Sequence, residues 1–222
     1  ICNRREADDL IAAGLVQVNG KVIVTMGYKV QPSDEVKYNG SLIKSEKKKY
    51  LVLNKPKGFI TSITDKKAKK TVEELVGNAC RERLYPVGSM DRTSTGVLLF
   101  TNDVDLAKKM AHPKNGAVQI ISVVLDKPLQ KTHLTAIAKG MELEDGKIDV
   151  EEIKYIDERT KREVGLRLHS GKHRLVNRIF DKFGYTIEKM DRVSFAGFTK
   201  KNLSRGQWRF LDPKEVDFLK TR

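Results

Sequence analysis

The chain has 222 residues, 39% of them hydrophobic, which is enough for one ordinary domain plus a small one and disfavours disorder throughout. Lys and Arg total 43 against 29 Asp and Glu, and the net charge of +14 favours a polyanionic partner, either nucleic acid or an anionic membrane surface. No apolar run approaches the roughly 20 residues that a membrane span requires, so nucleic acid is the favoured partner and no membrane partner is expected.

The two cysteines, Cys2 and Cys80, lie far apart and have no Cys or His companions at the spacing of metal ligands. The sequence therefore predicts neither a disulfide framework nor a zinc site, and it fits a reduced cytoplasm. No secretory signal or transit peptide is evident. Because the chain begins without a Met, we expect its true N-terminus to lie before Ile1.

A helix is predicted at the start of the chain, over residues 3–13. Asn3 is a typical cap residue, and Gly14 supplies a stop at the other end. Arg4 and Arg5 then lie on the exposed first turn, where they could contact a polyanion.

A hairpin is predicted next, because Asn19-Gly20 between short apolar runs is a strong signal for a two-residue turn, and residues 36–38 should add a strand. The segment CNRREADDLIAAGLVQVNGKVI resembles the S4 RNA-binding module over about residues 1–40, without that module's preceding helix. The resemblance implies that the basic helix grips structured RNA, with Arg4 and Arg5 among the contacts. The alternative is a solvated basic helix end on an unrelated small domain.

A charged run at residues 44–49 predicts the domain boundary. We expect an S4-like RNA-binding domain at residues 1–45, incomplete at its N-terminus, and a second domain at residues 46–222. No internal repeat or low-complexity domain interrupts either part.

A short buried strand is predicted at residues 50–53, followed by a turn at residues 54–58 that carries Lys55 and Lys57. These lysines could meet phosphates, although isolated lysines are more often ordinary solvated charges. The same holds for the lysine cluster at residues 66–70, which is predicted to be a surface loop.

A helix is predicted to begin after Thr71, because Glu74 stands at the capping-box spacing. Its inner face includes Cys80, which is therefore expected to be a core residue rather than a reactive thiol.

A single carboxylate, Asp91, lies in a loop of small and hydroxyl residues ahead of a continuous apolar run at residues 97–100. Gly88 and Gly96 allow tight turns on either side, Arg92 adds positive charge, and the apolar run is predicted to be a strand covered on both faces. A loop held in this way is suited to catalysis. The alternative is that Asp91 is a turn aspartate whose side chain bonds its own backbone.

The remaining elements alternate between strands and helices. Helices are predicted from residue 102 or 103 to His112, over residues 134–138, 172–183 and from residue 212 onward; strands are predicted at residues 118–125, 147–156, 163–169, 193–198 and 208–211. Gly140 and Gly184 are expected to end their helices.

The stretch RLYPVGSMDRTSTGVLLFTND resembles the signature of the bacterial ribosomal-RNA pseudouridine synthases of the RsuA-like family. The resemblance implies an α+β fold in which the small S4-like module precedes a catalytic domain with a mixed, largely antiparallel sheet and flanking helices. It also implies isomerisation of a uridine to pseudouridine in ribosomal RNA, with Asp91 as the catalytic carboxylate. We expect a cytoplasmic monomer that needs no cofactor and no metal, and no nucleotide-binding or metal motif contradicts this.

A second motif, HSGKHRLVNRIFDKFGY, resembles the family's late motif and places on Asn177 the arginine that should pair with Asp91. Lys172, Arg174 and Arg178 flank that position and are expected to bind RNA, and Arg174 could replace the missing charge if its side chain or helix moved. The tyrosine expected to stack on the target base falls on Ile121, which can pack on a base or merely fill a buried strand.

Two hypotheses of different class follow. Asp91 favours an active synthase, in which it attacks the sugar or removes a sugar proton. The alternative is an RNA-binding protein that keeps the synthase fold with weak or lost catalysis, because four positions at or near the expected active site depart from the family: Ser89, Gln119, Ile121 and Asn177.

Overall fold

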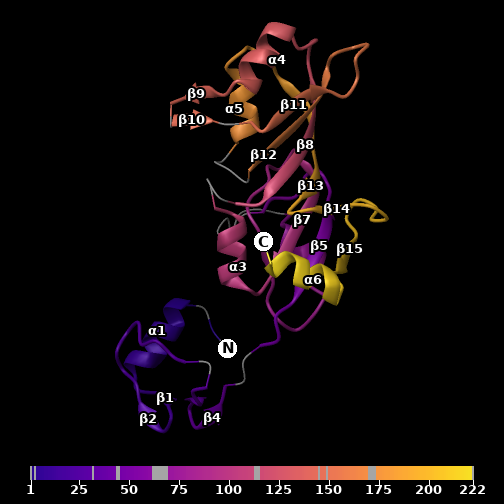
Figure 1. Ribbon diagram of the computed structural model, residues 1–222. Helices are drawn as coiled ribbons and strands as arrows, with labels where there is room; N and C mark the ends of the chain where they lie inside the picture. Colours follow the sequence, from indigo (N-terminus) through magenta and orange to yellow (C-terminus); the bar gives the residue numbers. More distant parts are fainter. Residues whose placement is uncertain are drawn as a thin grey trace. The chain divides into compact units, whose positions relative to one another are not determined.

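The computed structural model describes residues 2, 4–31, 33–43, 46–61, 70–112, 116–144, 146–148, 150–169 and 174–221 (Figure 1). The chain divides into two compact units, Ile1–Lys47 and Lys48–Arg222. None of the helices in the described ranges is long and apolar enough to cross a membrane.

The N-terminal unit has one helix and a small sheet in the strand order β2-β1-β3-β4. Its elements are α1 (Arg4–Ala12), β1 (Val16–Val18), β2 (Lys21–Val22), β3 (Val36–Tyr38) and β4 (Ser41–Leu42). The predicted helix and hairpin are confirmed, since Asn19 and Gly20 connect β1 to β2 with φ angles of 50° and 79°. Asn19 also donates from its side chain to Asp34 (2.9 Å) and accepts from the Glu35 backbone (2.9 Å), which holds the hairpin against the next strand. The predicted cap Asn3 lies outside the described residues.

The C-terminal unit is built on a nine-stranded sheet with the main order β11-β12-β8-β13-β7-β5-β15; β14 pairs with β13, and β6 pairs with β7. The strands are β5 (Tyr50–Lys55), β6 (Tyr85–Pro86), β7 (Thr95–Thr101), β8 (Val118–Leu125), β11 (Glu152–Tyr155), β12 (Glu163–His169), β13 (Ile187–Phe195), β14 (Phe198–Thr199) and β15 (Trp208–Phe210). Among these strands, only β7 and β13 pair in parallel. The α+β class with a mixed, largely antiparallel sheet is therefore confirmed.

Five helices and a separate hairpin accompany this sheet in the described part of the unit. They are α2 (Val72–Val76), α3 (Val104–Met110), α4 (Lys131–Ala138), α5 (Leu175–Asp181), α6 (Pro213–Lys220), β9 (Met141–Leu143) and β10 (Gly146–Ile148). The capping box predicted at Thr71 is present, the helix predicted from residue 212 onward also begins with a capping box at Asp212, and Asp103 caps α3. Cys80 follows α2 and is partly buried against the core, and burial raises the pKa of its thiol, as expected for a core residue.

The two halves of the sheet have separate cores. One cluster of buried apolar side chains lies around β8, β12, α4 and α5, and Ile179 and Phe180 are fully enclosed in it. Around β5 and β7 there are two clusters, because alternate residues of β7 are buried on opposite faces: Val97 and Leu99 on one, Leu98 and Phe100 on the other. The strands β7 and β13 are where the two halves meet.

The pairing of β7 with β13 is short and tight. Thr95 lies opposite Asp191, and Gly96 lies opposite Arg192. Gly96 has a φ of +113°, and a Cβ built on it would be 2.2 Å from the backbone oxygen of Arg192. Only glycine allows the two strands to approach this closely.

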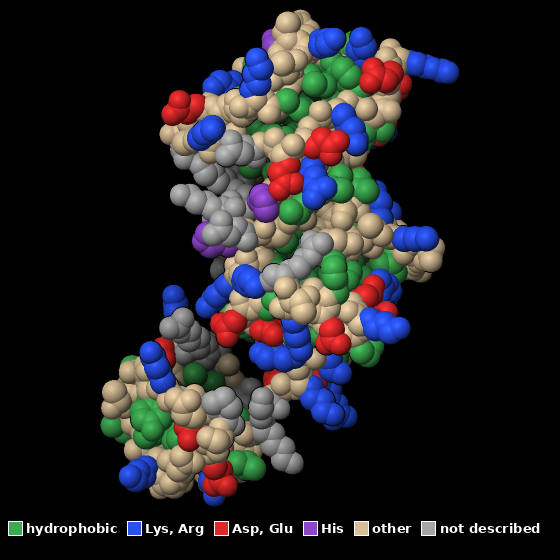
Figure 2. All heavy atoms as spheres, in the orientation of Figure 1, with side chains coloured by type: hydrophobic (Ala, Val, Ile, Leu, Met, Phe, Trp, Pro, Cys, Tyr) green, Lys and Arg blue, Asp and Glu red, His purple; other side chains and the backbone are tan. Residues whose placement is uncertain are grey.

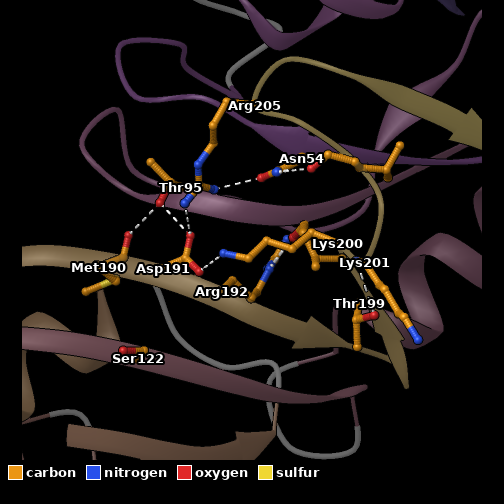
Figure 3. Close-up of polar contacts among 12 residues, drawn as sticks. Asn54, Thr95, Ser122, Met190, Asp191, Arg192, Thr199, Lys200, Lys201 and Arg205 are labelled. Atoms are coloured by element: carbon orange, nitrogen blue, oxygen red, sulfur yellow. Dashed lines mark hydrogen bonds and ion pairs between the residues drawn. The ribbon is translucent and has the colours of Figure 1, made fainter. Parts of the chain in front are cut away.

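Polar side chains around Asp191 fasten the same junction (Figure 3). Thr95 donates to the carboxylate at 2.6 Å, Arg205 donates to it at 2.7 Å, and Lys200 forms an ion pair with it. Arg205 also donates to Asn54 on β5 at 2.7 Å, so three strands share one network. Burial alone would raise the pKa of Asp191, but the hydrogen bonds from Lys200, Thr95 and Arg205 outweigh it and hold the pKa below its ordinary value.

Two strand predictions were wrong. The strand predicted at residues 147–156 is divided between β10 and β11 in different sheets, because β10 pairs with the neighbouring β9 whereas β11 pairs with β12. The strand predicted at residues 193–198 begins earlier, at Ile187, and ends at Phe195. Its register with β8 shifts twice, which breaks the alternation of apolar residues that sequence analysis relies on.

We expect Gly96→Ala to destabilise the C-terminal unit by about 4 kcal/mol or more, because the new Cβ forces β7 and β13 apart. Gly184→Ala is the matched control, since Gly184 also has a positive φ (+71°) but open space around it, and it should cost only about 1–2 kcal/mol. Urea unfolding followed by the fluorescence of the single Trp, Trp208, measures both. Equal losses would contradict the steric role of Gly96.

Candidate active site

Asp91 lies in the loop between β6 and β7, and hydrogen bonds tie this loop to the segment after β5. The Thr61 hydroxyl donates to the Met90 carbonyl (3.2 Å) and accepts from the Met90 amide (3.1 Å). The amide of Gly58 donates to the carbonyl of Arg92 at 2.8 Å. Gly88 has a φ of +74°, as the predicted turn requires. The loop is therefore held on both sides of Asp91.

The structure corrects the prediction that Lys55 lies on a turn where it could meet phosphates. It was expected on an exposed turn, but it is the last residue of β5 and has an exposed fraction of 0%. Its Nζ donates to the carbonyls of Ser94 (2.7 Å), Asp91 (3.0 Å) and Pro56 (3.3 Å). Burial, aided by the charge of Arg192 and opposed by that of Asp91, lowers the pKa of Lys55 to about 8. Lys55 fastens the Asp91 loop from below, and no phosphate can reach it.

A cavity of about 160 Å³ opens beside Asp91. Its walls come from the Asp91 loop, from β8, from the start of α5 and from β13. The volume is well below the roughly 300–1,000 Å³ of pockets for drug-sized ligands, and it suits one small ring such as a nucleobase. Segments that are distant in the sequence thus form one polar and apolar site around the carboxylate.

Arg174 supplies a cation to Asp91, with 3.3 Å between its Nε and Oδ1 of the carboxylate. The predicted helix over residues 172–183 begins only at Leu175, because Arg174 has φ 51° and ψ 29°, a left-handed conformation outside any right-handed helix. This conformation brings the arginine to the carboxylate without a shift of α5. The side chain of Arg174 is 63% exposed, so this ion pair adds little to the stability of the fold.

Asn177 occupies the position where the resemblance expects the arginine. It lines the cavity from α5, and its Oδ1 is buried without a hydrogen-bond partner among the described residues. The other departures lie here too: Ser89, Gln119 and Ile121 all line the cavity. Ile121 is 6% exposed and belongs to the core cluster as well, so it fills a buried strand and forms a wall of the site.

Arg192 and Met190 on β13 line the cavity and were not predicted as site residues. Arg192 is 4% exposed; its Nε donates to the carbonyl of Val97 at 2.6 Å, and its guanidinium lies 4.4 Å from the centre of the Phe195 ring. Burial lowers the pKa of Arg192 to about 9, so the group remains a cation at neutral pH. The sequence signal that could have identified Arg192 is a charged residue within a buried strand. The strand was predicted at residues 193–198, so Arg192 fell one residue before it.

Among the other predicted site residues that the structure describes in the C-terminal unit, Lys57, Arg92 and Arg178 do not line the cavity. Lys57 and Arg92 are exposed beside the Asp91 loop, and Arg178 is half-buried on α5. Lys172 lies outside the described residues. Arg4 and Arg5 begin α1 in the N-terminal unit, where Arg5 is exposed.

On the face drawn in Figure 2, Lys and Arg side chains are spread out, with Asp and Glu side chains between them. Within the described ranges, no group of His, Cys, Asp and Glu is placed to hold a metal ion.

Comparisons with known proteins point to one family. A family model described as RNA pseudouridylate synthase matches residues 49–182, and the S4 domain model matches residues 1–36. Ribosomal large subunit pseudouridine synthase B of Bacillus subtilis is 34% identical, with 99% of this chain and 91% of the relative covered. Dual-specificity RNA pseudouridine synthase RluF of Escherichia coli K12 is 31% identical, with coverages of 99% and 75%. A crystal structure of a pseudouridylate synthase shares the fold, with a TM-score of 0.70 at 24% identity over 98% of this chain and 94% of that one.

The low pKa of Lys55 predicts a rise in stability at alkaline pH. Between about pH 8, its folded pKa, and 10.5, its ordinary value, the unfolded chain binds a proton that the folded protein does not. The free energy of unfolding of the parent, relative to Lys55→Met, should therefore increase across this window.

Urea unfolding at several pH values between 7 and 10.5 measures this difference, and Lys57→Met removes the same charge from an exposed neighbour as the control. A difference that stays flat or falls with pH would mean that Lys55 is not a buried, partly deprotonated lysine.

Proposed function

The chain belongs to the RNA pseudouridylate synthase family, and we propose that it isomerises a uridine of ribosomal RNA to pseudouridine with Asp91 as the catalytic carboxylate. The resemblance to RsuA-like synthases is thereby confirmed at the level of the family. The observation that carries the proposal is the cavity itself, which has the size of one base and has Asp91 in its wall with Arg174 beside it.

The reaction only rearranges bonds within one nucleotide. The bond from N1 of uracil to C1′ of the ribose breaks, the uracil turns, C5 bonds to C1′, and the hydrogen of C5 is lost as a proton while N1 gains one. Nothing is oxidised or reduced. Asp91 would attack the sugar or remove a sugar proton, and either role needs an ionised carboxylate next to the ribose.

Arg174 supports the active hypothesis over the loss of catalysis. Arg174 forms an ion pair with the Asp91 carboxylate and can hold it in position, although Asn177 replaces the expected arginine. Ile121 provides no phenol, but together with Met190 it offers an apolar surface on which a base can pack. The charge that the sequence motif lacks is thus present in the folded site.

Ribosomal RNA is the proposed substrate for two reasons. The relatives from Bacillus subtilis and Escherichia coli are named as ribosomal large subunit and dual-specificity RNA pseudouridine synthases, respectively. The S4 domain match and the net charge of +14 both suit structured RNA, to which exposed basic residues such as Arg5, Lys57 and Arg92 would bind through phosphates. Such a substrate places the protein in the cytoplasm. We also propose that the protein acts as a monomer.

Asp91→Asn should abolish pseudouridine formation and leave folding and RNA affinity nearly unchanged, because a carboxamide cannot act as nucleophile or base. The assay is single-turnover conversion of ribosomal-RNA fragments labelled with tritium at C5 of uridine, since that hydrogen is released when C5 bonds to C1′. Thermal melts and RNA-binding curves provide the controls. Undiminished release by the variant would place the chemistry elsewhere, and no release by the parent on any fragment would favour the RNA-binding alternative.

Arg174→Gln should slow conversion at saturating RNA by roughly tenfold or more, because it removes the ion pair that positions the Asp91 carboxylate and the positive charge beside the reacting sugar. Arg178→Gln is the control: it removes the same charge from α5 but from a residue that does not line the cavity. At saturating RNA the measured rate does not depend on RNA affinity, so a change in affinity cannot account for a difference between the variants. Equal rates for the two variants would show that Arg174 has no special role.

A further inference from the structure

We propose that Arg192 and Asn177 bind the N3 edge of the target uracil: the Arg192 guanidinium donates to the carbonyl O4 of the bound uridine, and Asn177 Oδ1 accepts the N3 proton. This inference rests on the proposed function, because it names how the same cavity selects its base. Two atoms carry it. Nη2 of Arg192 and Oδ1 of Asn177 are both buried and have no hydrogen-bond partner among the described residues, and both side chains line the cavity that contains Asp91.

Unpaired buried groups are costly to keep. A donor or acceptor that has lost water without gaining a partner costs about 1–3 kcal/mol, and more when it is charged. Here a donor and an acceptor are left unpaired at one cavity, next to the catalytic carboxylate. A ligand that offers one acceptor and one donor at adjacent ring positions would satisfy both groups and recover this cost.

Uracil offers that pattern and cytosine does not. The N3 proton of uracil is flanked by the carbonyls O2 and O4. N3 of cytosine has no proton, and it lies between the O2 carbonyl and an amino group that replaces O4, so a donor placed at position 4 meets a second donor. The Asn177 amide could reverse to suit either base. Arg192 could not, because a guanidinium has only donors. Its position is also fixed by the bond to Val97 and by the Phe195 ring, so it would face the cytosine amino group with a second donor.

The same two contacts persist while the base turns. A half-turn about the axis through N3 and C6 exchanges N1 with C5, as the reaction requires, and it exchanges O2 with O4. The N3 proton stays where it was. Asn177 would therefore keep its hydrogen bond, and Arg192 would donate to one carbonyl before the turn and to the other after it. The cation would also stabilise the negative charge that spreads to these oxygens when the bond from N1 to C1′ breaks.

This arrangement gives the departure at position 177 a role. An arginine there would offer only donors, so it could not accept the N3 proton. With Arg174 paired to Asp91, position 177 is free to carry an acceptor, and asparagine supplies it. The base-binding acceptor and the cation for the carboxylate are then provided by two different residues.

The test uses the whole protein and three nucleotides: uridine 5′-monophosphate, its 3-methyl derivative and cytidine 5′-monophosphate. Each is titrated while the methyl signals of Ile121 and Met190, both at the cavity, are followed by NMR. The uridine nucleotide should bind at least roughly tenfold more tightly than either of the others, because each of those loses or opposes one hydrogen bond. Asn177→Leu should bind the uridine nucleotide and its 3-methyl derivative alike, and Arg192→Lys should lose most of the discrimination against cytidine. Arg167→Lys, in the neighbouring strand β12 and outside the cavity, should behave as the parent.

Equal affinity of the parent for the uridine nucleotide and its 3-methyl derivative, or no response at Ile121 and Met190, would overturn the inference. The comparison needs no variant to fold and no catalysis to occur. If the parent converts uridine in RNA but shows no selectivity among the nucleotides, the proposed function stands and this inference falls. If it selects the uridine nucleotide without converting RNA, the inference stands and the proposed function falls.

Discussion

The close parallel pairing of β7 with β13 is the constraint on which the catalytic unit depends. Gly96 allows the backbone of Arg192 to approach, and the network around Asp191 fastens the contact from Thr95, Lys200 and Arg205. Each half of the sheet has its own core, so this junction decides how the halves meet. It also assembles the cavity, because the Asp91 loop leads into β7 while Arg192 belongs to β13 and Ile121 belongs to β8. Stability and function therefore rest on the same few backbone contacts.

Positive charge is placed around Asp91 at three depths. Lys55 is buried under the loop and donates its hydrogen bonds to backbone carbonyls. Arg192 is buried in the cavity wall, and Arg174 is exposed beside the carboxylate. The exposed pair contributes little to folding, and a buried cation without a carboxylate partner costs stability. Lys55 holds the Asp91 loop through backbone carbonyls, whereas Arg174 and Arg192 line the cavity, where cations can stabilise charge that develops during a reaction.

The sequence predicted the features that depend on short-range physics. The hairpin at Asn19-Gly20, the capping boxes and the buried strand before Thr101 all arise from local turn, cap and burial preferences, and the structure confirms them. Asp91 was placed in a rigid loop, but its neighbours there are set by tertiary contacts. Lys55 looked like a turn lysine because nothing in its neighbours shows that three carbonyls will surround it. Arg174 was a candidate to replace the missing charge only if its side chain or helix moved, because periodicity does not reveal the left-handed residue ahead of α5. Arg192 was missed, because two register shifts in β13 are invisible to periodicity.

The central claim is that this junction assembles a working uridine isomerase around Asp91, and pseudouridine mapping of ribosomal RNA tests it most directly. Ribosomal RNA is compared from cells that contain the parent protein, cells that lack it and cells that contain only the Asp91→Asn form. The account predicts at least one position that is pseudouridine with the parent and uridine in the other two. An identical pseudouridine map in all three would contradict it.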